Sequence, residues 1–114
     1  MAQIVREMIQ NSIDSFIRMD TTLAKKVIIA DKTLDKINVE NHKLIIDIMK
    51  EERETIDEGV AYMVMCRQLE RIGDHATNIA EDVYFIAEAR TVRHNYCEFF
   101  EGNPDNSPFE EREN

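Results

Sequence analysis

Apolar residues recur along the first part of the chain at the spacing of an amphipathic helix. Over residues 2–18 they follow one another at intervals of four, four and three: Val5, Ile9, Ile13 and Phe16. Intervals of three and four place side chains on one face of a helix. These four residues are therefore expected to form the buried stripe of a first helix.

A second helix is predicted to begin at the polar run Asp20-Thr21-Thr22, whose short side chains can accept hydrogen bonds from free N–H groups. Its inward positions alternate in steps of four and three over nearly four heptads: Leu23, Val27, Ala30, Leu34, Ile37, Asn41, Leu44 and Ile48. This repeat favours long helices that cross at shallow angles. Asn41 is the polar member, and a partly exposed bundle edge is preferred over a role in fixing register or meeting a partner. The charged run 50–54 is expected to close the helix.

A third helix is predicted from about Ile56, after Thr55-x-x-Glu58, which has the form of a capping box. Its seam alternates three and four without a break: Tyr62, Met65, Leu69, Ile72, Ala76, Ile79, Val83 and Ile86. Ile72 and Ile79 are expected to be buried between helices. The pattern fails beyond Arg90.

Three helices joined by short connections predict an all-α fold, an up-down-up three-helix bundle. The bundle is expected over residues 1–94 and a C-terminal extension over residues 95–114. Both prolines lie in the aperiodic run 102–108, so the chain is expected to be mobile from about residue 102. Tyr96, Phe99 and Phe100 are expected to dock on the bundle of their own chain, with a second copy as the alternative.

The composition agrees with a helical protein that binds no nucleic acid. Of 114 residues, 43% are hydrophobic and 32% charged. The chain has only three glycines and two prolines, which disfavours folds that need many tight turns. The formal charge of -9 opposes binding to a phosphate backbone. Cys66 and Cys97 form no Cys-x-x-Cys pair, and residues 1–7 lack the pattern of a signal peptide. Reduced thiols and a cytoplasmic location are expected.

Two pairs of acidic residues stand four positions apart on the second and third predicted helices. Asp31 and Asp35 form one pair, and Glu70 and Asp74 form the other. Residues four apart lie one above the other on a helix face, so each pair offers two oxygens to a metal ion. Carboxylates at this spacing also arise by chance on the exposed helices of an acidic protein. The spacing alone therefore leaves a metal site and a solvated surface open.

On the third helix, Glu70, Asp74, Thr77 and Glu81 fall on one stripe, roughly opposite the apolar seam. This stripe is expected to lie on the outside of the bundle. Gly73 interrupts the helix at a cost of about 1 kcal/mol, which close packing or room for a ligand would offset.

The sequence offers no pattern for catalysis. No Glu has a His three positions later, as ferritin-like di-iron bundles require, and no nucleophile has an evident base beside it in a motif. Glycine-rich phosphate loops are also absent from the sequence. A non-enzymatic role is expected.

The run Leu69-Glu70-Arg71-Ile72-Gly73-Asp74-His75-Ala76-Thr77-Asn78-Ile79-Ala80-Glu81 resembles the signature of the PhoU family, regulators of bacterial phosphate uptake. Asp31-Lys32-Thr33-Leu34-Asp35 and Val92-Arg93-His94 extend the resemblance to about residues 4–94. The family fold is a three-helix bundle repeated twice, and this sequence is most similar to the C-terminal repeat.

The resemblance implies clusters of iron or zinc on the bundle surface. Carried over, the ligands are Asp31, Asp35, Glu70 and Asp74, with Asn78 and Glu81 as additional candidates further along the third helix. Carboxylates also suit Mn or Mg.

The resemblance further implies a cytoplasmic adaptor and negative regulator of phosphate homeostasis. It would link the phosphate transporter's ATPase to a membrane sensor histidine kinase and reach the membrane only through such partners. A metal-binding or metal-storage bundle and the cytoplasmic regulatory domain of a sodium-phosphate symporter are the alternatives. With one repeat, the chain is either a fragment of a longer protein or a short form that pairs with itself as a homodimer.

Overall fold

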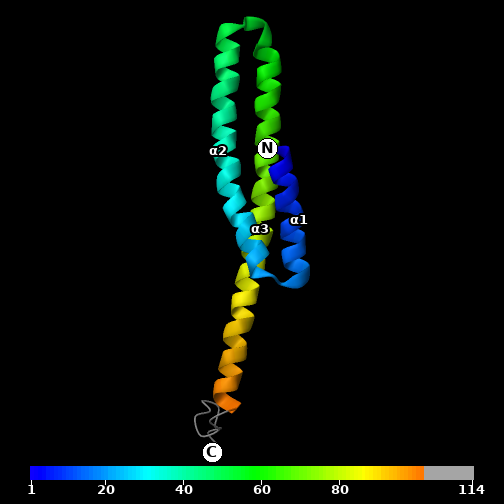
Figure 1. Ribbon diagram of the computed structural model, residues 1–114, viewed down its shortest axis with the longest axis vertical. Helices are drawn as coiled ribbons and strands as arrows, with labels where there is room; N and C mark the ends of the chain where they lie inside the picture. Colours follow the sequence, from blue (N-terminus) through cyan, green and yellow to red (C-terminus); the bar gives the residue numbers. More distant parts are fainter. Residues whose placement is uncertain (102–114) are drawn as a thin grey trace, which may run out of the picture.

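The part of the chain that the structure describes folds into three α-helices, as the sequence predicts. The computed structural model describes the backbone of residues 1–101 and the side chains of residues 1–93. Its elements are α1 (Ala2–Arg18), α2 (Thr21–Glu51), the single 3₁₀ turn η1 (Arg53–Thr55) and α3 (Ile56–Glu101). Figure 1 shows α2 and α3 as a long hairpin, with α1 packed along its lower half. The prediction of an all-α, up-down-up three-helix bundle is confirmed.

Short polar and left-handed residues make the first chain reversal. Met19 adopts the left-handed conformation, with φ 51°, and closes α1. The Asp20 carboxylate then accepts hydrogen bonds from the backbone N–H of Thr22 at 2.9 Å and of Leu23 at 3.2 Å. These bonds satisfy two of the free donors at the start of α2, so the predicted cap is confirmed.

The second reversal begins α3 at Ile56, where the sequence predicts it, but Thr55 plays another role than expected. Its hydroxyl donates to the carbonyl oxygen of Glu52 at 2.6 Å. The Thr55 backbone N–H donates to the same oxygen at 3.1 Å and no hydrogen bond joins Thr55 to Glu58 in the described part of the chain, so the capping-box interpretation of Thr55 is wrong.

The buried face of α1 differs from the predicted stripe and consists of Val5, Met8, Ser12 and Ser15. Ile9, Ile13 and Phe16 are instead 38%, 45% and 60% exposed. The serines can be buried because their hydroxyls donate within the helix, from Ser12 to the Ile9 carbonyl at 2.8 Å and from Ser15 to the Ser12 carbonyl at 2.7 Å. A buried polar group that keeps a hydrogen bond costs little, and its small size lets the helices approach.

The buried face of α3 is also rotated from the predicted seam. It is made mainly of small residues: Gly59, Cys66, Gly73, Ala76, Thr77, Ala80 and Val83. From the seam, Ala76 and Val83 are buried, but the larger members are 41–61% exposed: Tyr62, Met65, Ile72, Ile79 and Ile86. The expectation that Ile72 and Ile79 are buried is wrong, because small side chains occupy the close contact between helices.

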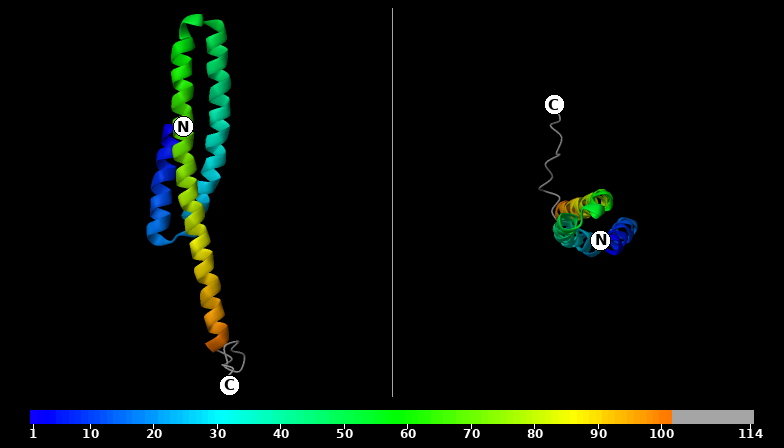
Figure 2. Two further views of the ribbon diagram at one scale, coloured as in Figure 1. Left: turned by 180° about the vertical axis from the view of Figure 1, so that it is seen from behind. Right: turned by 90° about the horizontal axis from the view of Figure 1, so that it is seen from above.

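On α2 the buried face agrees better with the predicted seam. Val27 and Leu34 are fully buried, as expected, and Asn41 is half-buried. The polar residue in the core is Asn38, which is 9% exposed. Leu44 is exposed because α1 does not reach the upper half of the hairpin (Figures 1 and 2).

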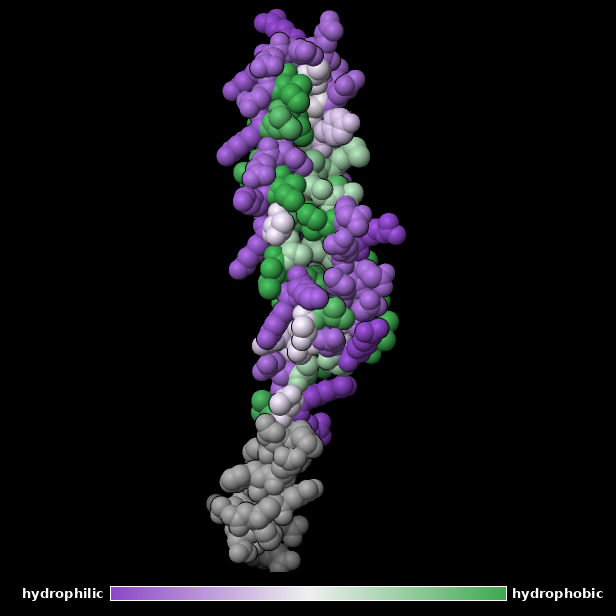
Figure 3. All heavy atoms as spheres, viewed as in Figure 1, coloured by the Kyte–Doolittle hydropathy of each residue, from purple (hydrophilic) through white to green (hydrophobic). Residues whose placement is uncertain are grey.

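The upper hairpin therefore presents apolar side chains to the surface. Figure 3 shows them as a strip that runs down the front of the molecule, bordered by hydrophilic side chains on both sides. A small cavity near the tip is lined by residues from both helices, including Ile45, Met49, Gly59 and Tyr62.

Helix α3 continues past Arg90 to Glu101 and extends well below the ends of α1 and α2 (Figure 1). Tyr84 contacts the bundle, where the Lys25 ammonium lies 5.3 Å from the centre of its ring. The expected docking of Tyr96, Phe99 and Phe100 and the expected mobility beyond residue 102 lie outside the described side chains and residues. Within the described part of the chain, no helix combines the length and the apolar composition needed to cross a membrane.

Candidate functional site

The acidic pair of α2 lies against α3. Asp31 is half-buried, and its Oδ1 atom is enclosed without a hydrogen-bond partner among the described residues. A buried carboxylate oxygen without a donor is energetically costly, so this atom is suited to a cation or another donor. Asp35, one turn further along α2, is exposed.

The four predicted carboxylates are close enough to influence one another. Burial raises the pKa of Asp31 above its ordinary value of 3.8, and the charges of Asp35 and Asp74 raise it further. Glu70 adds to the pKa increase, while the nearby Thr77 hydroxyl opposes it. Two helices therefore bring both acidic pairs into one electrostatic cluster, here called the acidic cluster: Asp31, Asp35, Glu70 and Asp74.

Close packing of α2 on α3 positions this cluster. Gly73 lies between Glu70 and Asp74 in sequence, and a Cβ atom there would lie 2.5 Å from Leu34 Cδ2. Leu34 is itself fully buried, next to Asp35 in sequence. Of the two reasons for Gly73, close packing of the helices is the one that the structure supports.

Thr77 departs from the position predicted for it. It is 8% exposed and donates its hydroxyl to the Gly73 carbonyl at 3.0 Å. Glu70 is half-buried as well. The stripe of α3 that was expected on the outside of the bundle thus turns one edge toward α2, because the buried face of α3 is rotated from the predicted seam.

Asn38 extends the site, although it is not among the site residues predicted from the sequence. Its Nδ2 atom donates to Glu70 Oε2 at 2.6 Å across the two helices, while its buried Oδ1 has no partner among the described residues. The signal was present in the sequence, since Asn38 follows Asp35 by three residues and Asp31 by seven. A polar stripe at steps of four and three runs beside the apolar seam of α2.

His42 lies one turn beyond Asn38. Its Nδ1 atom is 2.8 Å from the Asn38 carbonyl oxygen, and since a carbonyl oxygen only accepts, Nδ1 donates the hydrogen of this bond. Together with Arg67 and Glu70, these side chains line a surface depression between α2 and α3.

The remaining sequence candidates, Asn78 and Glu81, are exposed. In the described part of the chain, no hydrogen bond joins either one to the acidic cluster. Among the described side chains, no three His, Cys, Asp or Glu residues converge closely enough to hold a metal ion. The donor chemistry suits a hard cation, and the exposed carboxylates would have to rotate toward Asp31 to complete a coordination shell.

Comparison with known proteins gives a consistent assignment. The family model described as PhoU domain matches residues 1–83. A "Phosphate-specific transport system accessory protein PhoU homolog" of Pseudomonas putida is 37% identical over 90 residues, 79% of this chain and 35% of the relative. The protein of the same name from Pseudomonas aeruginosa is 38% identical over 90 residues, 79% of this chain and 37% of the relative.

A third relative of that name, from Borreliella burgdorferi, is 33% identical over 86 residues, 75% of this chain and 39% of the relative. The chain thus spans between a third and two fifths of the length of these relatives. The matched region contains both acidic pairs and the small-residue face of α3. The chain belongs to the PhoU family.

Proposed function

We propose that this chain acts as a non-enzymatic accessory regulator of phosphate uptake and as a negative regulator of the phosphate-starvation response. The observation that carries the proposal is its identity of 37–38% to accessory proteins of phosphate-specific transport systems. An acidic, elongated bundle with uncovered apolar faces is also suited to binding proteins rather than to catalysis. The proposed location is the cytoplasm.

The test is complementation in a Pseudomonas aeruginosa strain that lacks its own PhoU homolog. Expression of the chain is expected to lower the output of a phosphate-starvation reporter in phosphate-rich medium. A reporter that stays at its starvation level, with the protein present and folded, would contradict the proposal.

We propose that the phosphate transporter's ATPase docks in the apolar groove between α1 and α3, with the sensor histidine kinase as the further partner. Six residues line this groove: Ile13, Phe16, Ile79, Asp82, Val83 and Ile86. Phe16 is 60% exposed there, so burying its ring against a partner would add a large hydrophobic contribution to binding.

A matched pair of variants tests this surface. Phe16→Asp is expected to abolish retention of the purified ATPase by the immobilised chain. Ile17→Asp is the control, because Ile17 is 71% exposed but lies outside the groove. Equal loss of binding in both variants, or in neither, would contradict the proposed surface.

We also propose that the acidic cluster binds iron or zinc, or else Mn or Mg. Support comes from the unpartnered Asp31 oxygen and from the burial and neighbouring carboxylate charges that raise the pKa of Asp31. Asn38 offers an amide oxygen beside Glu70, and Asn78 and Glu81 remain additional candidates. A bound cation would turn the repulsion among four carboxylates into attraction.

Metal content can be measured by mass spectrometry on the protein purified from iron- and zinc-supplemented cells. Asp35→Ala combined with Asp74→Ala is expected to lose the metal. Asp47→Ala combined with Asp57→Ala removes two exposed acidic residues elsewhere and is expected to keep it. Retention of full stoichiometry in the first variant would contradict the site.

Finally, we propose that the chain pairs with itself as a homodimer. Support comes from the large apolar side chains that the described helices expose, which a second copy would cover.

A further inference from the structure

The lower part of α3 is a helix that packs against no other helix among the described residues. Beyond Tyr84 it runs to Glu101, past the ends of α1 and α2, as Figures 1 and 2 show. We call this segment, residues 85–101, the α3 overhang. Isolated helices of this length are marginal in water, and most helical stability in proteins comes from packing of an apolar face.

The overhang carries such a face. Phe85 is 75% exposed and Val92 is 65% exposed, and Ala89 lies between them on the exposed surface. At about 100° per residue, these three side chains fall within a narrow arc of the helix. Their spacing of four and three is that of the inward positions of a coiled coil. In sequence, the same spacing continues to Tyr96 and Phe99.

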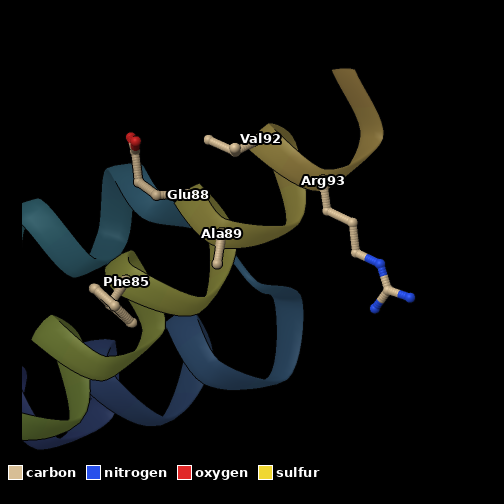
Figure 4. A pocket seen from close by; sticks show the side chains of 5 residues that line it. All are labelled: Phe85, Glu88, Ala89, Val92 and Arg93. Carbon is tan, nitrogen blue, oxygen red and sulfur yellow. The ribbon is translucent and has the colours of Figure 1, made fainter. Parts of the chain in front are cut away.

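Opposite charges border this stripe. Glu88 lies on one side of it and Arg93 on the other, and Figure 4 shows the two side chains pointing away from each other. The five residues Phe85, Glu88, Ala89, Val92 and Arg93 line a single surface depression made by α3 alone. In coiled-coil notation, Glu88 is a g position and Arg93 the following e position.

This arrangement of charges selects both the partner and the direction. In a parallel pair of identical helices, a g residue faces the e residue five positions later on the other helix. Glu88 of each copy would then meet Arg93 of the other, which gives two attractive pairs related by a two-fold axis. Antiparallel pairing would set like charges together.

The start of the paired region follows from the same register. Asp82 precedes Phe85 by three residues and occupies the next inward position. Two Asp82 carboxylates facing each other would repel, so the pairing begins at Phe85. Docking on the bundle of the same chain is disfavoured, because the overhang is one continuous helix that leads away from it.

We propose that the α3 overhang of this chain pairs in parallel with the α3 overhang of a second copy, through the stripe that begins at Phe85, Ala89 and Val92. The inference rests on the self-association proposed above and names its surface. The contact is shorter than a standard protein interface of roughly 1,600 Å², so the dimer is expected to dissociate in the micromolar to millimolar range.

The first test is sedimentation of the full chain over that range of concentration. The wild-type mass is expected to rise from 13.3 kDa toward twice that value. Val92→Asp is expected to stay at the lower mass, whereas Thr91→Asp, on the same turn but off the stripe, is expected to dimerise normally. Both residues are exposed in the single chain, so both variants should keep their helical circular dichroism.

The second test exchanges the charges. Glu88→Arg or Arg93→Glu alone is expected to weaken the dimer about tenfold, because two attractive pairs become repulsive. The double variant restores both pairs and is expected to return to within about twofold of the wild type. Antiparallel pairing predicts no such recovery.

A wild type that stays monomeric throughout overturns both this inference and the proposed self-association. A dimer that persists in Val92→Asp overturns the overhang surface alone. Failure of the double charge exchange to restore pairing overturns the parallel arrangement.

Discussion

A single hydrogen atom at Gly73 sets how closely α2 and α3 approach beside the acidic cluster. Glycine inside a helix costs about 1 kcal/mol relative to alanine, so its presence needs a compensating contact. The compensation is the packing of the fully buried Leu34 side chain into the space that a Cβ atom would fill. Because these two residues fit together, α2 and α3 approach closely enough for the charges of Asp74 and Glu70 to act on Asp31.

Replacing that hydrogen with a methyl group should therefore destabilise the bundle. In Gly73→Ala, Leu34 must shift within the core, at an overpacking cost of about 1–3 kcal/mol against a propensity gain of about 1 kcal/mol. The expected net loss is about 1 kcal/mol in the free energy of unfolding, measured by urea titration. Gly59→Ala is expected to destabilise the protein as well, because its new methyl would meet Met49 Sδ and Cγ and lie 3.2 Å from Ile45 Cγ2. A stabilised Gly73→Ala would contradict the close contact.

Asp31 is the residue whose protonation should couple the site to folding. Burial and then the charges of Asp35 and Asp74 raise its folded-state pKa above 3.8, so the folded state holds the proton more tightly than the unfolded chain does. Metal-free protein should therefore lose stability as pH rises from below 3.8 through the raised pKa, and no further above it.

Asp31→Asn cannot titrate and should escape this loss. With a chelator present, the variant is expected to gain stability relative to wild type as pH rises from acid to neutral, as measured by urea titration at each pH. The exposed Asp47→Asn should run parallel to wild type. Equal pH dependence in Asp31→Asn and wild type would mean that the surroundings do not raise the pKa of the Asp31 carboxyl.

At the scale of the helices, contact distance rather than side-chain size decides what is buried. Leu34 is fully buried on α2, whereas Ile72 on α3 is 41% exposed. Leu34→Ala should therefore cost about 2–5 kcal/mol in the free energy of unfolding. Ile72→Ala should cost about 1 kcal/mol or less, since half of its side chain already contacts water. Similar losses of stability in urea titrations of the two variants would mean that Ile72 is buried in the core, as the seam predicted from the sequence requires.

Except for the end of α3, which lies at Glu101 and past the end of the periodic pattern at Arg90, the helix bounds could be predicted because they depend on local signals. Asp20 caps α2, and the polar run after residue 50 marks the hairpin tip, so three helices in the right places follow from the sequence. The rotations of α1 and α3 could not be predicted, because the periodic large residues of these two helices suggested the wrong buried face. Ser12, Ser15 and Thr77 are buried only because their hydroxyls find carbonyl partners in their own helices.

In the candidate site, too, some features could be predicted from the sequence and others could not. Spacing of four identifies both acidic pairs, and the structure brings them together. The cross-helix bond from Asn38 to Glu70 depends on the rotation of both helices, which the pattern of one helix does not contain. The sequence pattern placed Asn41 in the seam, at a partly exposed bundle edge, and gave no reason to expect that Asn38 would be buried.

At the scale of the whole molecule, an excess of acidic residues is spread over an extended shape. The principal extents are 83 × 29 × 17 Å, and the formal charge is -9. Self-repulsion of this charge destabilises the compact state at low ionic strength, and the acidic cluster adds a local contribution. General screening by salt and specific binding of a cation should therefore be separable.

Monovalent salt is expected to raise the unfolding temperature gradually, since it screens all exposed charges. A transition metal ion at the same ionic strength should add a saturating increase, worth about 2.7 kcal/mol when its free concentration is a hundred times the dissociation constant. Asp35→Ala combined with Asp74→Ala should keep the response to salt and lose the response to metal, because only the second depends on the acidic cluster. Asp47→Ala combined with Asp57→Ala carries the same change in net charge and should keep both responses. If the two double variants respond to metal alike in thermal unfolding, the ion acts on the overall charge of the molecule and not on the cluster between α2 and α3.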